Sequence, residues 1–188
     1  MSVNRSWVRT VTTLAVLATA GCAGAGAGSG PAAGSGGTPA KAADPPVDRV
    51  YVSGSGDPAD DWRDEGMLGE DLPLRSDLAA LWQTVLWADG YLGRADIDCR
   101  FAGETPRATR VWQSNRKLGA DGIVGPLTLA RAGERLVERE GEVFYRGAEH
   151  TVSFRRAPDG RYLVEDDGSY KPLRRDRATL TVCEAGER

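Results

Sequence analysis

Few side chains in this sequence can do covalent or metal chemistry. His150 is the only histidine, so a zinc site built from two or three histidines is excluded. Of the three cysteines, Cys183 served by His150 is the catalytic-thiol alternative. The 27 acidic residues leave a hydrolytic carboxylate pair open, because a glycoside hydrolase needs only two. We expect no metal and no cofactor.

The strongest local pattern is a turn followed by a helix start. Residues 121–128 read DGIVGPLT, in which two glycines flank two β-branched residues and a proline follows where a helix can begin. A less regular copy, DCRFAGET, occupies residues 98–105 and keeps the aspartate, the apolar fourth residue and the threonine. A Trp-Gln pair precedes each turn, at residues 82–83 and 112–113. The stretch is therefore a degenerate tandem repeat.

Three helices are expected to position the two turns. The first is capped by Ser76 or Asp77 and ends at Gly90, the second starts at residues 105–106, and the third starts at Pro126. Apolar residues recur at helical spacing within each of them. They are Leu78, Leu81, Trp82, Val85 and Leu86, then Ala108, Val111 and Trp112, then Leu129, Ala132, Leu136 and Val137.

After Gly141 the pattern changes to the alternation typical of strands. Turn signals PDG and DDG lie at residues 158–160 and 166–168. The expected strands cover residues 143–145, 151–155, 162–164 and 180–182. The fold class is therefore predicted to be α+β, a small three-helix module followed by a short antiparallel sheet over residues 141–188. The two parts either pack as one domain or stand side by side.

Residues 76–137 resemble the bacterial peptidoglycan-binding domain, a small three-helix module. The resemblance covers about a third of the chain, and the second turn is its most specific piece. Cys99 and Ala102 stand where the family has glycines, and a side chain at a left-handed position costs on the order of 1 kcal/mol. The positions that carry the resemblance are Leu86, Gly90, Tyr91, residues 98–105, Ala108, Trp112, Gln113, residues 121–125 and Thr128.

The resemblance implies a shallow groove near the turns and helix starts that binds the glycan and stem peptide of peptidoglycan. Backbone N–H groups, an arginine for carboxylates and an aromatic edge suit such a ligand. Arg107 and Arg110 are the preferred ligand contacts, because a helix leaves them solvated beside the groove. The full set of implied ligand residues is Arg100, Phe101, Arg107, Arg110, Asp121, Ile123 and Thr128.

Several of these positions also have a structural interpretation. Asp98 and Asp121 are expected to hold their own turns by accepting backbone N–H bonds. The threonines at 105 and 128 are expected to cap their helices or to bond within the first helical turn. The glutamines at 83 and 113 are expected to tie helices to loops, and the tryptophans at 82 and 112 to lie in the core.

The first residues have the layout of an export signal. Arg5 and Arg9 precede an uncharged run, residues 11–21, that is too short to span a bilayer permanently. Residues 19–22, TAGC, resemble a bacterial lipobox, in which Cys22 is acylated and becomes the first residue of the mature chain. Residues 1–21 are thus the expected signal peptide. The protein is expected at the outer face of the cytoplasmic membrane as a lipoprotein, or secreted if Cys22 is not acylated.

Residues 22–46 and 47–75 connect this signal to the helical module. After Cys22 the first segment is almost entirely Ala, Gly, Ser, Thr and Pro, so it is predicted to be a flexible tether that reaches roughly 25 to 30 Å. The second, the lead-in, is acidic and is predicted to be solvated and partly ordered, with isolated apolar contacts at residues 50–52 and Trp62. The formal net charge of −3 disfavours a nucleic-acid partner.

Cys99 and Cys183 remain once Cys22 carries lipid. Outside the cytoplasm two such thiols usually pair, and this bridge would staple the first turn to the last strand. The enclosed loop of roughly 80 residues predicts a stabilisation on the order of 4 kcal/mol. The bridge would also explain why Cys99 replaces a glycine.

Non-catalytic binding of cell-wall peptidoglycan is therefore the favoured function. The first alternative is an envelope adaptor that docks a cell-wall enzyme through the lead-in or the sheet. The second is a muralytic hydrolase that uses two carboxylates, although no cleft-forming catalytic domain of the usual size fits outside residues 76–137.

Overall fold

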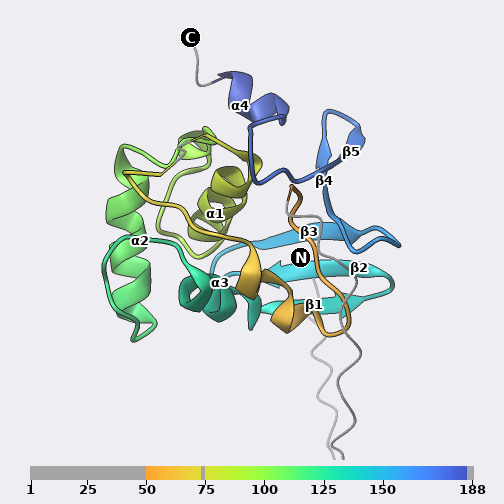
Figure 1. Ribbon diagram of the computed structural model, residues 1–188, viewed down its shortest axis with the longest axis horizontal. Coiled ribbons are helices and arrows are strands. Elements are labelled where there is room, and N and C mark those ends of the chain that lie inside the picture. Colours follow the sequence, from red (N-terminus) through yellow and green to blue (C-terminus); the bar gives the residue numbers. More distant parts are fainter. Residues whose placement is uncertain (1–49, 73–74, 186–188) are drawn as a thin grey trace, which may run out of the picture. The chain divides into compact units, whose positions relative to one another are not determined.

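The computed structural model describes residues 50–72 and 75–185 (Figure 1). The expected signal peptide, Cys22 and the tether lie outside these residues, so what concerns them stays a prediction. In the described part, no helix combines the length and apolar character that a membrane span requires. The described helices and strands all fall within one compact unit, Ala42–Arg188, so the helical part and the sheet belong together.

Helices and an antiparallel sheet confirm the α+β class. Among the described residues, two short 3-10 helices accompany four α-helices, and the sheet is a meander with the strand order β1-β2-β3-β4-β5. The helical elements are η1 (Pro58–Asp64), α1 (Asp77–Ala88), η2 (Arg94–Asp96), α2 (Glu104–Asn115), α3 (Pro126–Gly133) and α4 (Thr181–Ala185). The strands are β1 (Leu136–Arg139), β2 (Glu142–Arg146), β3 (Thr151–Arg156), β4 (Tyr162–Asp166) and β5 (Ser169–Pro172).

Helix α1 lies at the centre of this unit (Figure 1). Ser76 caps it as expected, because its hydroxyl accepts a bond from the Ala79 N–H. Ten of its twelve residues are buried, so the helix is enclosed on most sides rather than on the one apolar face that the sequence predicts. The polar positions Asp77 and Gln83 tolerate burial because each is hydrogen-bonded to other segments.

The sheet turns follow local sequence rules. Glu140 and Gly141 both have positive φ, as do Asp167 and Gly168, which makes two-residue hairpin turns of the type that matches strand twist. The turns expected at residues 158–160 and 166–168 are both present between the strands that they were expected to join. The strands expected at residues 143–145, 151–155 and 162–164 are confirmed as well.

Two predicted elements are wrong. The third helix ends at Gly133, and Leu136 and Val137 belong to β1, because they pair with β2 opposite Tyr145 and Phe144. Residues 180–182 are not a strand but enter helix α4, so Cys183 lies on a helix. A distant carboxylate holds the backbone that leads into α4. Asp77 accepts the N–H groups of Thr179 and Leu180, which lie 102 and 103 residues away in sequence.

The lead-in is more deeply buried than predicted, although the expected apolar contact at Trp62 is confirmed and five of its seven described acidic residues are exposed. Trp62 is 1% exposed and its ring contacts the rings of Tyr145, Phe154 and Tyr162. Its acidic residues are not all solvated, since two of them are buried and accept hydrogen bonds from arginines of the C-terminal half. Asp61 pairs with Arg156 at 2.8 Å and Glu65 with Arg175 at 3.2 Å.

One buried carboxylate joins the helices to the sheet. Asp89 follows α1 and accepts bonds from the Trp112 indole at 2.7 Å, the Tyr145 hydroxyl at 2.8 Å and the Ala148 N–H at 2.9 Å. Arg116 also pairs with it. Helices α1 and α2, strand β2 and the β2–β3 turn therefore meet at a single side chain.

Candidate functional site

The two predicted turns share one hydrogen-bond frame, centred on a glutamine of the preceding helix. At the first turn the Gln83 side-chain N–H group donates to Asp98 at 2.7 Å, to the Arg100 carbonyl at 2.9 Å and to Thr105 at 3.1 Å. Its oxygen accepts the Asp98 and Cys99 N–H groups at 3.1 and 2.9 Å. Asp98 in turn accepts the Arg100 N–H at 2.9 Å.

The second turn repeats five of these six contacts; the counterpart of the Asp98 N–H bond is the exception. The Gln113 side chain donates to Asp121 at 2.9 Å, to the Ile123 carbonyl at 2.8 Å and to Thr128 at 3.1 Å. Its oxygen accepts the Gly122 N–H at 2.9 Å, and Asp121 accepts the Ile123 N–H at 2.8 Å. The structural interpretation of the glutamines and aspartates is therefore confirmed, and the tandem repeat is real in three dimensions. The expectation for the threonines is wrong, because Thr105 and Thr128 accept bonds from the glutamines of the preceding helices.

The two turns lie at opposite ends of α2. Thr105 and Gln113, which anchor one turn each, are eight residues apart, or about 12 Å along a helix axis. The tryptophans of the repeat are core residues as expected, fully buried and in edge-to-face contact at 5.0 Å. The exposed side of α2, which carries Arg107 and Arg110, connects the two turns.

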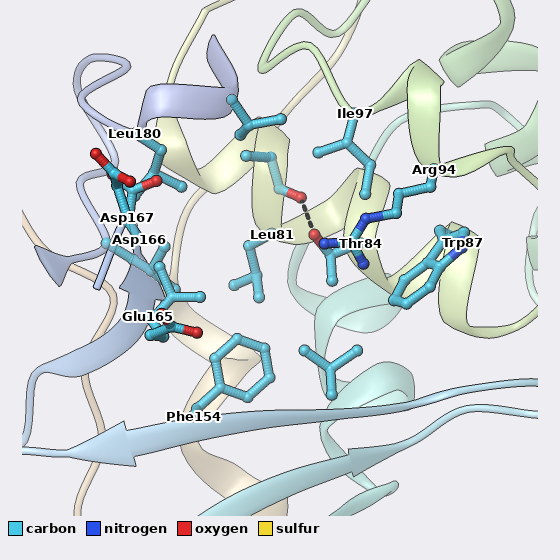
Figure 2. A pocket seen from close by; sticks show the side chains of 15 residues that line it. Leu81, Thr84, Trp87, Arg94, Ile97, Phe154, Glu165, Asp166, Asp167 and Leu180 are labelled. Atoms are coloured by element: carbon cyan, nitrogen blue, oxygen red, sulfur yellow. Dashed lines mark hydrogen bonds between the residues drawn. The ribbon is translucent and has the colours of Figure 1, made fainter. Parts of the chain in front are cut away.

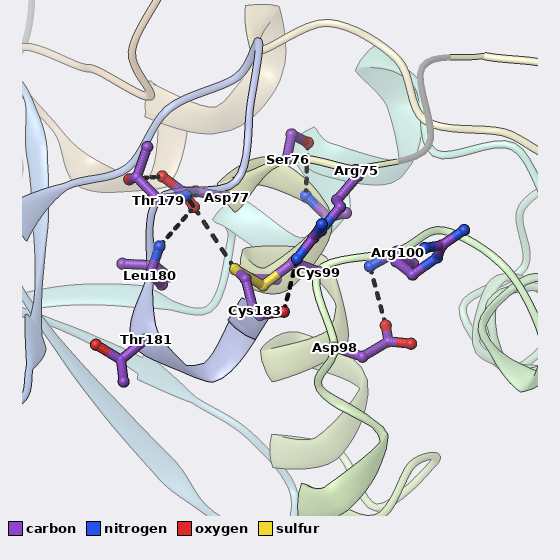
Figure 3. Close-up of a disulfide and its surroundings, with 12 residues drawn as sticks. Arg75, Ser76, Asp77, Asp98, Cys99, Arg100, Thr179, Leu180, Thr181 and Cys183 are labelled. Atoms are coloured by element: carbon purple, nitrogen blue, oxygen red, sulfur yellow. Dashed lines mark hydrogen bonds between the residues drawn. A yellow bond between two sulfur atoms is a disulfide. The ribbon is translucent and has the colours of Figure 1, made fainter. Parts of the chain in front are cut away.

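The first turn is closed by the C-terminal segment (Figure 3). Cys99 and Cys183 form the expected disulfide, across a sequence separation of 84. Cys99 has φ +65°, the left-handed value that Gly122 has at +80°, so this cysteine holds a strained position that glycine fills in the second turn. The Arg75 guanidinium also donates to the Cys183 carbonyl at 2.8 Å, which fixes α4 over this turn.

The second turn is supported by the lead-in and stays open. Leu68 and Val124 exchange two backbone hydrogen bonds of 2.9 Å, and both side chains are buried. Side chains alternate along such a pairing, so Met67 and Ile123 lie on the opposite, solvent side, where both are exposed. A Cβ atom added at Gly125 would meet no atom within 4 Å, so no other residue covers this glycine on that side.

The helix starts beside the two turns differ in charge. Neither α2 nor α3 has a side-chain cap, because glycines stand at both N-cap positions. Helix α2 carries Glu104 in its first turn, which complements the positive end of the helix, and Arg107 pairs with it at 3.1 Å. Helix α3 has no acidic residue there and presents Leu127 instead. The N-terminus of α3 is the one that favours an anion.

Arg110 lies directly over the second turn. Its Nε would be 2.9 Å from a side-chain carbon added at Gly122, and its guanidinium pairs with Glu70 of the lead-in at 3.2 Å. The Ile123 N–H bond, the Gln113 bond and the Arg110 charge hold the pKa of Asp121 below its usual value. Asp121 therefore stays ionised and fixes the turn, rather than serving as a proton donor.

The surface at this turn is called the second-turn face. It consists of Met67, Glu70, Arg110, Ile123 and Leu127, which are all exposed, with Leu127 at 79%. It combines one guanidinium, one uncapped helix start and three apolar side chains. Such a surface can hold a carboxylate beside an apolar or sugar ring face.

The structure separates the sequence-predicted ligand residues into two groups. Arg100, Arg107, Arg110, Asp121 and Ile123 are exposed. Phe101 and Thr128 are 0% and 4% exposed, so their assignment as ligand contacts is corrected. Phe101 precedes the α2 start as Val124 precedes that of α3, and both fill the core beneath their turns; Thr128 is held by Gln113.

Three residues of the second-turn face were missed by sequence reasoning. Met67 and Glu70 belong to the lead-in, and only the pairing of Leu68 with Val124 brings them there. Leu127 follows the turn directly, and its exposure could have been inferred from its place in the first turn of α3, outside the Leu129 and Ala132 stripe.

A hollow of about 400 Å³ lies elsewhere, between α1, η2, the β3–β4 part of the sheet and the segment that leads into α4 (Figure 2). None of the sequence-predicted ligand residues lines it.

The structure tests one of the catalytic alternatives directly. Cys183 is bridged, which contradicts the catalytic-thiol alternative. Within residues 50–72 and 75–185, no cluster of three or more His, Cys, Asp or Glu residues is arranged to hold a metal ion. Burial raises the pKa of Glu65 to about 8, yet this carboxyl is 1% exposed and bonded to Arg175 and the Ser53 N–H.

No family model, curated protein or solved structure matches this chain.

Proposed function

We propose that this protein binds cell-wall peptidoglycan without cleaving it, and that the second-turn face is its contact surface. The proposal is supported by the resemblance of residues 76–137 to peptidoglycan-binding domains and by the paired turn frames built on Gln83 and Gln113. Export and acylation of Cys22 would anchor the protein at the outer face of the membrane. Without acylation it would be secreted.

The chemistry of the face suits this ligand. Peptidoglycan stems carry free carboxylates and amides, and its sugars present flat apolar faces. Arg110 can bind a carboxylate with two parallel hydrogen bonds, and the α3 start adds backbone N–H groups with partial positive charge. Ile123, Met67 and Leu127 offer apolar contact area beside them.

Glu70 competes with a ligand carboxylate for the Arg110 guanidinium. Their ion pair is solvent-exposed on both sides, at 47% and 61%, so it contributes little to stability and a ligand carboxylate can replace Glu70. Removing the Glu70 charge should therefore strengthen binding, whereas removing Arg110 should weaken it.

One observation carries the proposal: the two turns share a frame and an uncovered glycine at the helix start, Gly103 and Gly125, but only the second has a helix start without an acidic residue and an arginine, Arg110, over the turn. The first turn has Glu104 at its helix start and is bridged to α4 by the disulfide.

Co-sedimentation with isolated sacculi tests the proposal, with the unit Ala42–Arg188 as the protein. We expect the unaltered unit to be retained, Arg110→Ala to lose about tenfold in affinity, and Glu70→Gln to gain a few-fold. The matched control is Arg155→Ala, which removes an arginine of 49% exposure paired with Glu142 at 3.1 Å on the sheet. It should leave retention unchanged.

Two results would redirect the interpretation. No retention at any salt concentration would contradict wall binding and favour the adaptor hypothesis, in which a cell-wall enzyme is the partner. Release of dye from labelled sacculi by the same unit would contradict the absence of cleavage and favour the hydrolase hypothesis.

A further inference from the structure

The hollow beside α1 is built from four separate parts of the chain (Figure 2). Its walls are mostly apolar: Leu81 and Trp87 come from α1, Phe154 from β3, and Leu180 and Val182 from the segment that the disulfide holds. A volume of about 400 Å³ falls within the range of small-molecule sites, which are largely apolar with a few placed polar groups.

An arginine marks one end of this hollow. The Arg94 guanidinium lies 5.1 Å from the centre of the Trp87 ring and points toward Thr84 (Figure 2). No carboxylate of the described residues forms an ion pair with it, in contrast to Arg107 and Arg110. The Thr84 hydroxyl lines the hollow beside it and donates to the Ala80 carbonyl at 2.8 Å.

The opposite end is acidic, with Glu165, Asp166 and Asp167 (Figure 2). Asp166 is already neutralised by Lys171 at 2.6 Å and accepts the Thr181 N–H, whereas Glu165 and Asp167 are exposed to solvent. An anionic group is repelled from this end and attracted to Arg94. The electrostatic potential in the hollow therefore changes from negative at the acidic end to positive at Arg94.

We propose that this hollow binds a small apolar monocarboxylate, with its chain or ring between α1 and the sheet and its carboxylate on Arg94. The apolar walls favour a hydrocarbon body, and the guanidinium favours one carboxylate. The site shares no residue with the second-turn face, so it does not rest on the function proposed above.

Isothermal titration of the full-length chain with decanoate tests this site, with decanol as the neutral control of equal chain length. We expect decanoate to bind at least tenfold more tightly than decanol. Arg94→Ala should weaken decanoate binding at least tenfold and leave decanol unchanged. Thr84→Phe, which places a larger side chain in the hollow next to Arg94, should weaken binding of both at least tenfold; thermal melting confirms that each variant is folded.

Equal affinities for decanoate and decanol would overturn the assignment of the carboxylate to Arg94. Decanoate binding that Thr84→Phe leaves intact in folded protein would show that the ligand lies elsewhere. Absence of binding for both probes up to millimolar concentration would overturn the site itself, including the case in which another part of the chain fills the hollow.

Discussion

The two turns of this protein have the same internal frame and different surroundings. Each has an aspartate, a glutamine from the helix before it and a threonine from the helix after it, in matching hydrogen bonds. The first turn is bridged to α4 and its helix start is complemented by Glu104; the second is free of both. A repeated frame can therefore serve stability at one copy and leave the other available for recognition.

The disulfide is the largest difference between the copies, and removing it should have the largest effect. Cys99→Gly with Cys183→Ser gives the first turn the glycine of the second and opens a loop closed over 84 residues. We expect a loss of about 4 kcal/mol in unfolding free energy by the loop-entropy argument, offset by about 1 kcal/mol because glycine relieves the left-handed position. Urea unfolding measures the net change in unfolding free energy.

The matched control is Cys99→Ser with Cys183→Ser, which lacks that relief and should be less stable than the glycine variant. Folded protein of either variant should still be retained on sacculi. If retention falls while the protein is folded, the first turn takes part in binding and the comparison fails.

The glutamines should differ in their local effect. Gln113→Ala and Gln83→Ala each leave several buried groups unsatisfied, so we expect a loss of about 3 kcal/mol in each case. Because the disulfide also fastens the first turn, amide exchange should accelerate more at Gly122 and Ile123 in Gln113→Ala than at Cys99 and Arg100 in Gln83→Ala.

Hydrogen-exchange mass spectrometry or NMR makes that measurement. Equal acceleration at the two turns would mean that the bridge adds no local constraint beyond the glutamine frame.

A residue of the lead-in that supports the second turn makes the unfolding free energy depend on pH. Burial raises the pKa of Glu65 to about 8 from an ordinary value of 4.5. The folded state therefore holds a proton that the unfolded state releases, so stability is full below about pH 4.5 and is lost as the pH rises toward 8.

Glu65→Gln should remove this decline while keeping a side chain of the same size. Urea unfolding between pH 4.5 and 8 tests it. If the unfolding free energy changes with pH as steeply in Glu65→Gln as in the unaltered protein, its pH dependence comes from another group.

Local features of this chain were predictable from sequence. The turns at residues 98–105 and 121–128, the Ser76 cap and the Pro126 start depend on neighbouring residues, and the structure has all of them. The Cys99–Cys183 bridge was predictable because few thiols remained to pair.

What the sequence did not predict depends on contacts across long separations. Within the buried part of the lead-in, Asp61 and Glu65 contact Arg156 and Arg175, which lie 95 and 110 residues away. Residues 180–182 alternate like a strand, but the Asp77 bonds and the bridge place them at α4. The second-turn face shares this cause, since Met67 and Glu70 reach it only through the lead-in.

NMR titration of isotope-labelled Ala42–Arg188 with soluble muropeptides tests the central claim most directly, because it reads both turns at once. The account predicts the largest amide shifts at Ile123, Gly125 and Leu127, with the equivalent residues Arg100, Ala102 and Glu104 unaffected. Shifts concentrated at the first turn, shifts confined to Thr84 and Arg94 of the hollow, or no shifts at saturating ligand would contradict it.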